Sequence, residues 1–393
     1  MRVTMLVIDS GGIGDAPDAT RFGDSGANTI KHTATAVGGL SLPNLSAMGL
    51  KALVPTPDIF GGELKGAASV IHPRANGKDT LAGHWEMMGL TVTTPFRTYP
   101  QGFPPPVVSA LSQAFGQPML GNEVASGTEI MARLGAKHLE TGWPIVYTSA
   151  DSVLQIAAHE ERVPLKTLYA WCQAARDLMQ GPNLVGRIIA RPFVGEPGAF
   201  VRTANRHDYA VRPWAPTEVD VLAQNGVKTV AVGKIGDIFS GQGFGDLVRS
   251  QSNLDGLQKT RDILRRPESR PEFIFVNLVE FDSHWGHRRN PEGYAEGLRQ
   301  LDSFLPQLWE ALGDDDQLWI TADHGCDPTY QGTDHTRENV PWLVWGPSVP
   351  ALVGAPRSTL ADLGATLGAI FSTPKVGDGQ VWETLVPEWR ATT

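Results

Sequence analysis

The chain has 393 residues, of which 41% are hydrophobic, an ordinary share for a folded protein with a large core. At roughly 150 residues per domain, this length suggests two or three domains. The formal net charge of −9 argues against a general nucleic-acid binder, because such proteins usually present a basic face. Two cysteines, Cys172 and Cys326, cannot build a disulfide framework and fit a reducing compartment.

The N-terminal apolar run, residues 3–8, is too short for a signal peptide. No stretch approaches the roughly 18 apolar residues that a membrane span needs. The sequence therefore predicts a cytoplasmic protein with no membrane partner.

Residues 3–9 predict a buried strand that ends at Asp9, and a glycine-rich loop follows over residues 9–17. The loop is not a dinucleotide fingerprint, because Pro17 stands where the pattern G-x-G-x-x-G would need a glycine. A tight turn after a core strand explains the glycines, so the aspartate is the more informative feature. Residues 41–50 then predict a short helix from their apolar spacing.

Residues 77–89 predict a helix that Asp79 or Thr80 could cap. Thr80 also offers an alcohol at the helix N-terminus, where free backbone N–H groups and the helix dipole favour a phosphate. From these residues alone, Thr80 is either a phosphorylated nucleophile or a simple helix cap.

Two proline-rich stretches, 93–106 and 211–216, enclose a strand-and-helix region. We predict that residues 97–213 form an inserted α+β cap domain, with residues 1–96 and 214–393 as the two parts of a core domain. The strand-and-helix alternation resumes at residues 227–233. The core is expected to be an α/β, doubly wound and mostly parallel sheet.

Residues 273–282 and 317–323 are also predicted as buried strands ending on aspartates, and histidines follow both. Ligands of an open α/β sheet bind at the carboxyl ends of its parallel strands, so neighbouring strands would bring these side chains to one rim. Carboxylates and imidazoles suit Mn²⁺, Zn²⁺ or iron, and two metal ions about 3.5–4 Å apart can clamp both oxygens of a phosphoryl displacement. The candidate metal ligands are Asp9, Asp282, His287, Asp323, His324 and His335.

Each of these pieces has an ordinary alternative. A strand-ending aspartate is often a helix cap or a turn residue, and residues 282–287 could form a polar surface loop. Cys326 could be a ligand, but a soft thiolate would be unusual beside hard carboxylates, so we expect only a small residue near the site. The joint pattern favours a metalloenzyme over these separate explanations.

The assembled motifs resemble those of the bacterial phosphopentomutases (phosphodeoxyribomutases) of the alkaline phosphatase superfamily. The likeness covers essentially the whole chain and includes D-S-x-G-I-G-x-A-P-D at 9–18, G-K-D-T-x-x-G-H-W-E at 77–86 and A-D-H-G-x-D-P-T at 322–329. Further matching segments in the same order lie at 147–160, 191–198, 202–209, 233–239 and 282–289.

The resemblance implies an isomerase with an alkaline phosphatase-like core, which interconverts (deoxy)ribose 1-phosphate and (deoxy)ribose 5-phosphate. The reaction would pass through a phosphothreonine at Thr80 and a pentose bisphosphate, and would link nucleoside breakdown to pentose phosphate metabolism. A sugar bisphosphate such as glucose 1,6-bisphosphate would prime Thr80. The implied partners are small phosphorylated pentoses and no nucleic acid, and we expect a monomer or weak oligomer.

The resemblance also implies the division of the ligands. Asp282, His287 and His335 would hold one metal ion, and Asp9, Asp323 and His324 the other. The family usually works with Mn²⁺, although other divalent ions are possible. The implied substrate-binding residues are Asp151, Arg187 and Arg202 for the ribose phosphate and Lys234 near the transferring phosphate.

From the residues alone, a solvated surface position is favoured over substrate binding for each arginine, and Asp151 could merely end a strand. The chain departs from the family in one place, since Ala82 stands where a second hydroxyl is common, which leaves Thr80 as the motif's only hydroxyl. A phosphomonoesterase or a metal-dependent phosphoglycerate mutase would share the core pattern, but the cap motifs and the use of threonine disfavour both. A non-catalytic metal-binding protein is the alternative from a different class.

Overall fold

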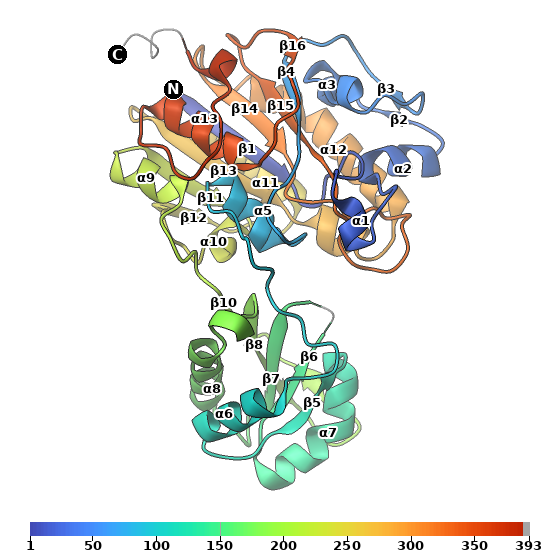
Figure 1. Ribbon diagram of the computed structural model, residues 1–393, viewed down its shortest axis with the longest axis vertical. Helices are drawn as coiled ribbons and strands as arrows, with labels where there is room; N and C mark the ends of the chain where they lie inside the picture. The colour runs from blue at the N-terminus through green and yellow to red at the C-terminus, as the bar shows by residue number, and fades with distance from the viewer. Residues whose placement is uncertain (150, 388–393) are drawn as a thin grey trace. The chain divides into compact units, whose positions relative to one another are not determined.

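A computed structural model describes residues 1–149 and 151–387, which divide into two compact units (Figure 1). Unit 1 combines Met1–Thr94 with the segment that starts at Arg212, and unit 2 is Pro95–Val211. Unit 2 therefore begins at residue 95 rather than 97 and ends at 211 rather than 213.

Unit 1 is built on an eight-stranded sheet in which only β15 runs against the other strands. Its central strands are apolar and buried along almost their whole length, as expected of parallel strands covered on both faces. The strands, in spatial order, are β12 (Asp246–Val248), β11 (Lys228–Val232), β13 (Glu272–Leu278), β1 (Arg2–Ile8), β14 (Gln317–Thr321), β15 (Val340–Trp345), β4 (Ala67–Ile71) and β16 (Leu352–Val353).

Helices cover both faces of this sheet (Figure 1). On one face, α12 contacts α2, α3 and α11; on the other, α5 contacts α10 and α13, and α13 also contacts α9. The helices are α1 (Ala19–Phe22), α2 (Thr29–Ala36), α3 (Pro43–Ala47), α4 (Leu50–Leu53), α5 (Thr80–Met87), α9 (Glu218–Gln224), α10 (Ile235–Ile238), α11 (Asn253–Leu264), α12 (Pro291–Trp309) and α13 (Ala361–Phe371). A small separate sheet pairs β2 (Leu40–Ser41) with β3 (Ile59–Phe60).

One sequence-based expectation about these elements is wrong. β13 ends at Leu278, and Asp282 lies in a π-helical turn, Phe281–Gly286, rather than on a strand end. Such turns are rare and occur frequently at functional sites. The turn begins three residues after β13, so Asp282 stays near the carboxyl end of that strand.

Unit 2 has its own six-stranded sheet and its own hydrophobic core. Its main path runs β10 (His207–Ala210), β8 (Arg187–Val194), β7 (Val153–His159), β6 (Ile145–Thr148) and β5 (Leu120–Val124), and β9 (Val201–Arg202) pairs with β8. One hydrophobic cluster includes residues of α6 (Pro105–Phe115) and α8 (Leu165–Leu178), and a second includes residues of α7 (Gly127–Thr141). Unit 2 is thus an α+β domain inserted between two parts of unit 1.

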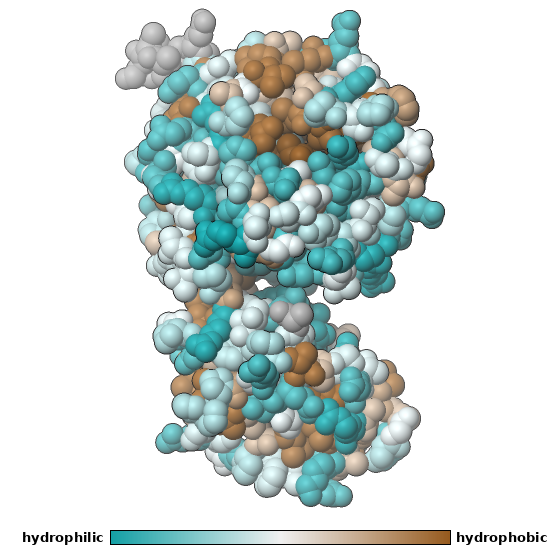
Figure 2. Space-filling view, turned by 45° about the vertical axis from the view of Figure 1, so that its right-hand side comes forward, coloured by the Kyte–Doolittle hydropathy of each residue, from teal (hydrophilic) through white to brown (hydrophobic). Residues whose placement is uncertain are grey.

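The face drawn in Figure 2 is mainly hydrophilic or neutral, with hydrophobic residues in separate groups. Among the large hydrophobic side chains of residues 1–149 and 151–387, those more than half exposed are Phe60, Val201, Trp214, Leu247 and Val353. Within the described part of the chain, no helix combines the length and the apolarity needed to cross a lipid bilayer.

Candidate active site

The candidate site lies at the carboxyl ends of three adjacent strands of unit 1. β1 pairs in parallel with β13 on one side and with β14 on the other. Asp9 follows β1 directly, and Asp323 comes two residues after β14. The backbone N–H of Ser10 donates to Asp323 Oδ1 over 3.0 Å, which ties the ends of β1 and β14 together.

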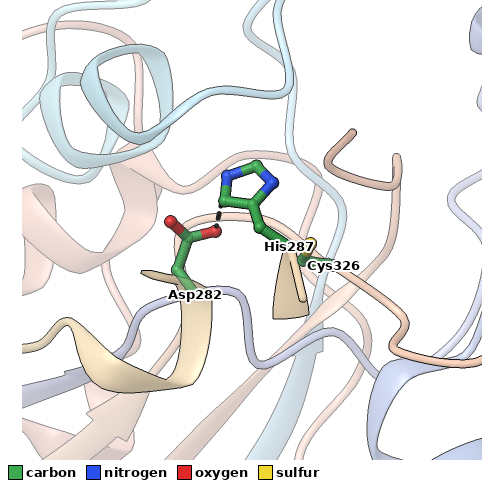
Figure 3. Close-up of side chains that lie close together, drawn as sticks. All are labelled: Asp282, His287 and Cys326. Atoms are coloured by element: carbon green, nitrogen blue, oxygen red, sulfur yellow. Dashed lines mark ion pairs between the residues drawn. The ribbon is translucent and has the colours of Figure 1, made fainter. Parts of the chain in front are cut away.

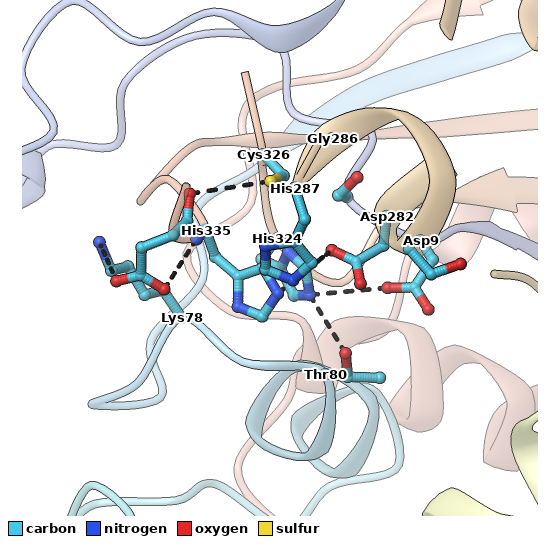
Figure 4. Close-up of polar contacts among 12 residues, drawn as sticks. Asp9, Lys78, Thr80, Asp282, Gly286, His287, His324, Cys326 and His335 are labelled. Atoms are coloured by element: carbon cyan, nitrogen blue, oxygen red, sulfur yellow. Dashed lines mark hydrogen bonds and ion pairs between the residues drawn. The ribbon is translucent and has the colours of Figure 1, made fainter. Parts of the chain in front are cut away.

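Asp9, Asp323 and His324 form the first group of candidate ligands (Figure 4 draws Asp9 and His324). His324 Nε2 lies 3.2 Å from Asp323 Oδ2 and 3.6 Å from Asp9 Oδ1. All three side chains are buried. The structure therefore brings together the three residues that the family resemblance assigned to one metal ion.

Asp282 is the centre of the second group. Its Oδ1 lies 3.1 Å from His335 Nε2 and 3.4 Å from His287 Nε2, so both predicted histidines approach it. The ligand atoms of Asp282, His324 and His335 lie within 4.8 Å of one another. The imidazole rings of His324 and His335 are 4.0 Å apart, which joins the two groups into one polar cluster.

Cys326 also enters this cluster (Figure 3). Its Sγ lies within 4.8 Å of ligand atoms of Asp282 and His287. Burial, with Asp282 nearby, raises the pKa of the Cys326 thiol. A raised thiol pKa disfavours the thiolate that a metal ion would bind, so we keep the prediction of a small residue beside the site.

Backbone carbonyls orient two of the histidines. Nδ1 of His287 lies 2.6 Å from the carbonyl oxygen of Thr333, and Nδ1 of His324 lies 3.0 Å from that of Gly325. A carbonyl accepts only, so each Nδ1 carries the proton it donates. Nε2 of both rings is then turned toward the carboxylates, as in histidines that ligate metal ions through Nε2.

The electrostatics of the cluster favour a bound cation. Burial, and then the neighbouring Asp323 and Asp282, raise the pKa of Asp9 well above its usual range. Burial opposes the charged form of His324, but Asp323 and Asp9 outweigh it and raise the pKa of His324 to about 10. Three buried carboxylates at one rim therefore need positive charge close by.

Unpaired atoms in the cluster fit the same requirement. Asp9 Oδ1 is buried and has no hydrogen-bond partner among the described residues. Asp282 Oδ1 and His335 Nε2 approach within 3.1 Å, yet their orientation is not that of a hydrogen bond. Buried polar atoms are normally satisfied, so a set of oxygen and imidazole atoms facing a common space fits divalent cations.

Thr80 is the first residue of α5, and its hydroxyl faces the same cluster (Figure 4). Thr80 Oγ1 lies 3.4 Å from His324 Nε2. The helix is capped by Asp79, whose Oδ1 accepts from the backbone N–H of Ala82 over 3.1 Å. Because Asp79 supplies the cap, the side-chain hydroxyl of Thr80 is not needed for capping.

Two residues that were not among the predicted site residues link these groups: His84 on α5 and Asn277 on β13. Asn277 Nδ2 donates to Asp9 Oδ2 over 3.0 Å and lies 3.3 Å from His84 Nε2. His84 Nδ1 lies 2.9 Å from the carbonyl oxygen of Thr80 and 3.1 Å from Asp323 Oδ2. His84 stands four residues after Thr80, one helical turn away, and it is also a matching position of the motif at 77–86; these are the sequence signals that could have identified it.

Two lysines belong to the surroundings of the site. Lys234 immediately precedes α10, and its charge acts to lower the pKa of Asp9 against the effect of burial. Lys78 Nζ lies 2.9 Å from Asp24 Oδ2 and 3.2 Å from Asp334 Oδ2 (Figure 4 labels Lys78). Lys78 therefore connects the segment before Thr80 to the segment before His335.

The remaining predicted residues belong to unit 2. Asp151 is exposed in the turn between β6 and β7, and Arg187 begins β8, with Nη1 3.9 Å from Asp208 Oδ2. Arg202 is exposed on β9. Its Nη2 would lie only 2.3 Å from a Cβ atom built on Gly127, so it rests against the start of α7.

Comparison with known proteins identifies relatives along nearly the whole chain. Residues 1–375 match the metalloenzyme superfamily. A phosphopentomutase of Symbiobacterium thermophilum is 51% identical over 385 residues, which cover 96% of this chain and 97% of that protein. A phosphopentomutase of Carboxydothermus hydrogenoformans is 50% identical over 382 residues, with the same coverage of 96% and 97%. Among solved structures, a phosphoglycerate mutase of Leishmania mexicana matches with a TM-score of 0.46 and 13% identity, over 96% of each chain.

Proposed function

Because the chain belongs to the phosphopentomutase family of the metalloenzyme superfamily, we propose that it interconverts pentose 1-phosphates and pentose 5-phosphates through a phosphothreonine at Thr80. The observation that carries this mechanism is the position of the Thr80 hydroxyl. It lies 3.4 Å from His324 Nε2, beside two groups of candidate metal ligands, while Asp79 caps the helix.

Divalent cations, Mn²⁺ being the first candidate, would neutralise the charge that develops on the phosphoryl oxygens. Asp9, Asp323 and His324 would hold one cation, and Asp282, His287 and His335 the other. The donor set of carboxylates and imidazoles supports this assignment. His84 and Asn277 support it further, because their hydrogen bonds orient Asp9 and Thr80.

The proposed reaction has two transfers. First, the bond between phosphorus and Thr80 Oγ breaks as a free hydroxyl of the pentose phosphate attacks, which gives a pentose bisphosphate and a free threonine. Thr80 then attacks the other phosphate of the bisphosphate, and the isomeric monophosphate leaves. The proton lost by the attacking hydroxyl in each transfer goes to the oxygen that departs, so the enzyme is regenerated. A sugar bisphosphate such as glucose 1,6-bisphosphate would supply the first phosphoryl group.

We also propose substrate contacts for the remaining residues. Arg202 and Arg187 can each offer a planar fork of N–H donors to a phosphate, and Asp151 can accept from a ribose hydroxyl. Lys234 would face the transferring phosphoryl group, which its influence on Asp9 supports.

The experiment combines a mutase assay on ribose 1-phosphate with a measurement of released phosphate, with and without Mn²⁺. We expect Mn²⁺-dependent formation of ribose 5-phosphate and little free phosphate. Rapid phosphate release without the isomer would instead indicate a phosphomonoesterase. Absence of any turnover would favour a metal-binding protein.

Thr80→Ala tests the nucleophile. The variant should lose mutase activity and should gain no phosphoryl mass when treated with glucose 1,6-bisphosphate, because no other hydroxyl occupies that position. Thr35→Ala is the control, since Thr35 is an exposed residue of α2 that hydrogen-bonds Asp58. Mutase activity that survives in Thr80→Ala would refute the phosphothreonine assignment.

A further inference from the structure

Arg337 is a buried cation for which the motifs suggested no role. It lies two residues after His335, on the segment that leads into β15. Its side chain is 3% exposed, and its guanidinium carbon lies 4.9 Å from the ring centre of Phe22. A buried arginine is costly unless its donors are satisfied, so its partners indicate what it does.

All five side-chain N–H groups of Arg337 have acceptors. Nε and Nη2 donate to the two carboxylate oxygens of Asp18 over 2.9 and 3.1 Å. The other three N–H groups donate to backbone carbonyls: Nη2 to Pro73 over 2.7 Å, and Nη1 to Ala75 over 2.8 Å and Gly77 over 2.9 Å. The guanidinium therefore binds the carbonyl of every second residue in one loop, residues 73–77, and this loop ends three residues before Thr80.

The same loop is held from its other side by Glu86. The backbone N–H groups of Arg74 and Ala75 donate to the Glu86 carboxylate, over 2.9 and 2.5 Å for the shortest contacts. Glu86 is a buried residue of α5, the helix that Thr80 begins. A cation thus binds the carbonyls of the loop while an anion binds its amides, which leaves the loop little freedom.

Asp24 adds a second connection between the two segments. Its Oδ2 accepts from the backbone N–H of Arg337 over 2.8 Å and from Lys78 Nζ over 2.9 Å. Lys78 also pairs with Asp334, next to His335. Residues 73–78 and 334–337 are therefore joined at several points, and these segments lead into Thr80 and contain His335.

We propose that Arg337 is a positioning residue that fixes the loop of residues 73–77 and thereby sets the place of the Thr80 hydroxyl relative to His324 and His335. The inference rests on the proposed function of Thr80. This position requires an arginine, because a lysine offers a point charge with three donors and cannot reach Asp18 and three carbonyls together. A shift of about 1 Å in a reacting group can reduce the rate about 100-fold.

The test compares Arg337→Lys with Arg74→Lys. Arg74 is in the same loop, but its side chain is 55% exposed and contacts Asp378 at the surface. In Arg337→Lys we expect kcat to fall by about 10- to 100-fold while KM for ribose 1-phosphate changes by less than about threefold. Bound Mn²⁺ should stay unchanged, and the backbone amides of residues 76–82 should exchange hydrogen faster. Arg74→Lys should behave as the wild type in all four measurements.

Asp18→Asn provides a second variant in case Arg337→Lys does not fold. It keeps the guanidinium but weakens its carboxylate partner, so it should show the same changes to a smaller extent. The proposal is overturned if kcat in a folded variant stays within about twofold of the wild type, or if the amides of residues 76–82 are unaffected. If the wild type itself has no mutase activity, the proposed function fails, and the amide exchange alone decides whether Arg337 fixes the loop.

Discussion

The amide of Asn277 offers one N–H to each of two neighbours at the candidate metal site. It donates to Asp9 Oδ2 over 3.0 Å and approaches His84 Nε2 at 3.3 Å. His84 in turn contacts the carbonyl of Thr80 and Asp323. One buried side chain therefore orients a candidate ligand directly and the proposed nucleophile, Thr80, indirectly, in the manner of groups that surround known metal ligands.

We predict that Asn277→Leu weakens Mn²⁺ binding about 10- to 100-fold while the protein stays folded. Leucine has a similar shape but cannot donate to Asp9 or His84. Calorimetric titration with Mn²⁺ measures the change without any assay of activity. Asn44→Leu is a matched control, because Asn44 donates hydrogen bonds to Asp302 away from the site. The Asn44→Leu variant should bind Mn²⁺ with the affinity of the wild type. Equal affinities in the two variants would contradict the role of Asn277.

Glu218 is a buried carboxyl away from the candidate ligands. Burial raises its pKa to about 7 from 4.5, against the effect of hydrogen bonds from Thr373 and Val376. Between pH 4.5 and about 7, Glu218 therefore keeps its proton in the folded protein, whereas the same carboxyl has lost its proton in the unfolded chain. The contribution of Glu218 protonation to the free energy of unfolding is fully present below pH 4.5, and it is lost as the pH rises through about 7.

Glu218→Gln should remove this pH dependence. Relative to the wild type, its free energy of unfolding should rise by about 2–3 kcal/mol between pH 5 and pH 8. Urea unfolding at both pH values measures the difference. Glu292→Gln, an exposed change at the start of α12, should show no such trend. A constant difference between Glu218→Gln and the wild type would show that Glu218 titrates as it does in the unfolded chain.

Helix α5 packs closely on the carboxyl end of β14 because Gly83 has no side chain. A Cβ atom on Gly83 would lie 2.4 Å from the carbonyl oxygen of Asp323 and 2.8 Å from its Cβ atom. Neither neighbour is the flexible end of a side chain, so the helix itself would have to move. The glycine of the motif at 77–86 thus allows the approach of Thr80 to His324.

We predict that Gly83→Ala destabilises the protein by about 1–3 kcal/mol, although alanine favours a helix by about 1 kcal/mol. Urea unfolding shows directly whether the free energy of unfolding of Gly83→Ala is lower or higher than that of the wild type. Gly256→Ala in α11 is the control, because the nearest atom to its new Cβ would be Ser250 Cβ at 3.6 Å, an ordinary contact. That variant should be unchanged or more stable by up to about 1 kcal/mol. Equal effects at the two positions would mean that α5 tolerates displacement.

At the scale of the whole molecule, the sequence reveals features whose signals are local. The parallel core follows from apolar runs such as β1 and β13, and the candidate ligands follow from carboxylates and histidines just beyond the strands. The π-helical turn that carries Asp282 leaves no mark in apolar periodicity. The role of Arg337 depends on Pro73, 264 positions away in the chain, and no local pattern encodes such a pairing.

A metal ion at the candidate site should stabilise unit 1 and have little effect on unit 2. Both groups of candidate ligands lie in unit 1, whereas unit 2 has hydrophobic clusters of its own. Without a cation, burial and the neighbouring carboxylates of Asp323 and Asp282 oppose the ionisation of Asp9. An ion bound only by the folded state at 100 times its Kd adds about 2.7 kcal/mol of stability.

Mn²⁺ should therefore slow hydrogen exchange in β1, β13 and β14 of unit 1 and leave β6, β7 and β8 of unit 2 nearly unchanged, because separate cores can open separately. Mass spectrometry of peptides after exchange would resolve the two units, and a chelator should reverse the effect. Asp323→Ala should respond less to Mn²⁺ than the wild type, since it lacks a ligand of the first group but keeps Asp282, His287 and His335 of the second. Equal slowing in both units would mean that they open together, whereas no slowing in unit 1 would remove the metal ion from the candidate site.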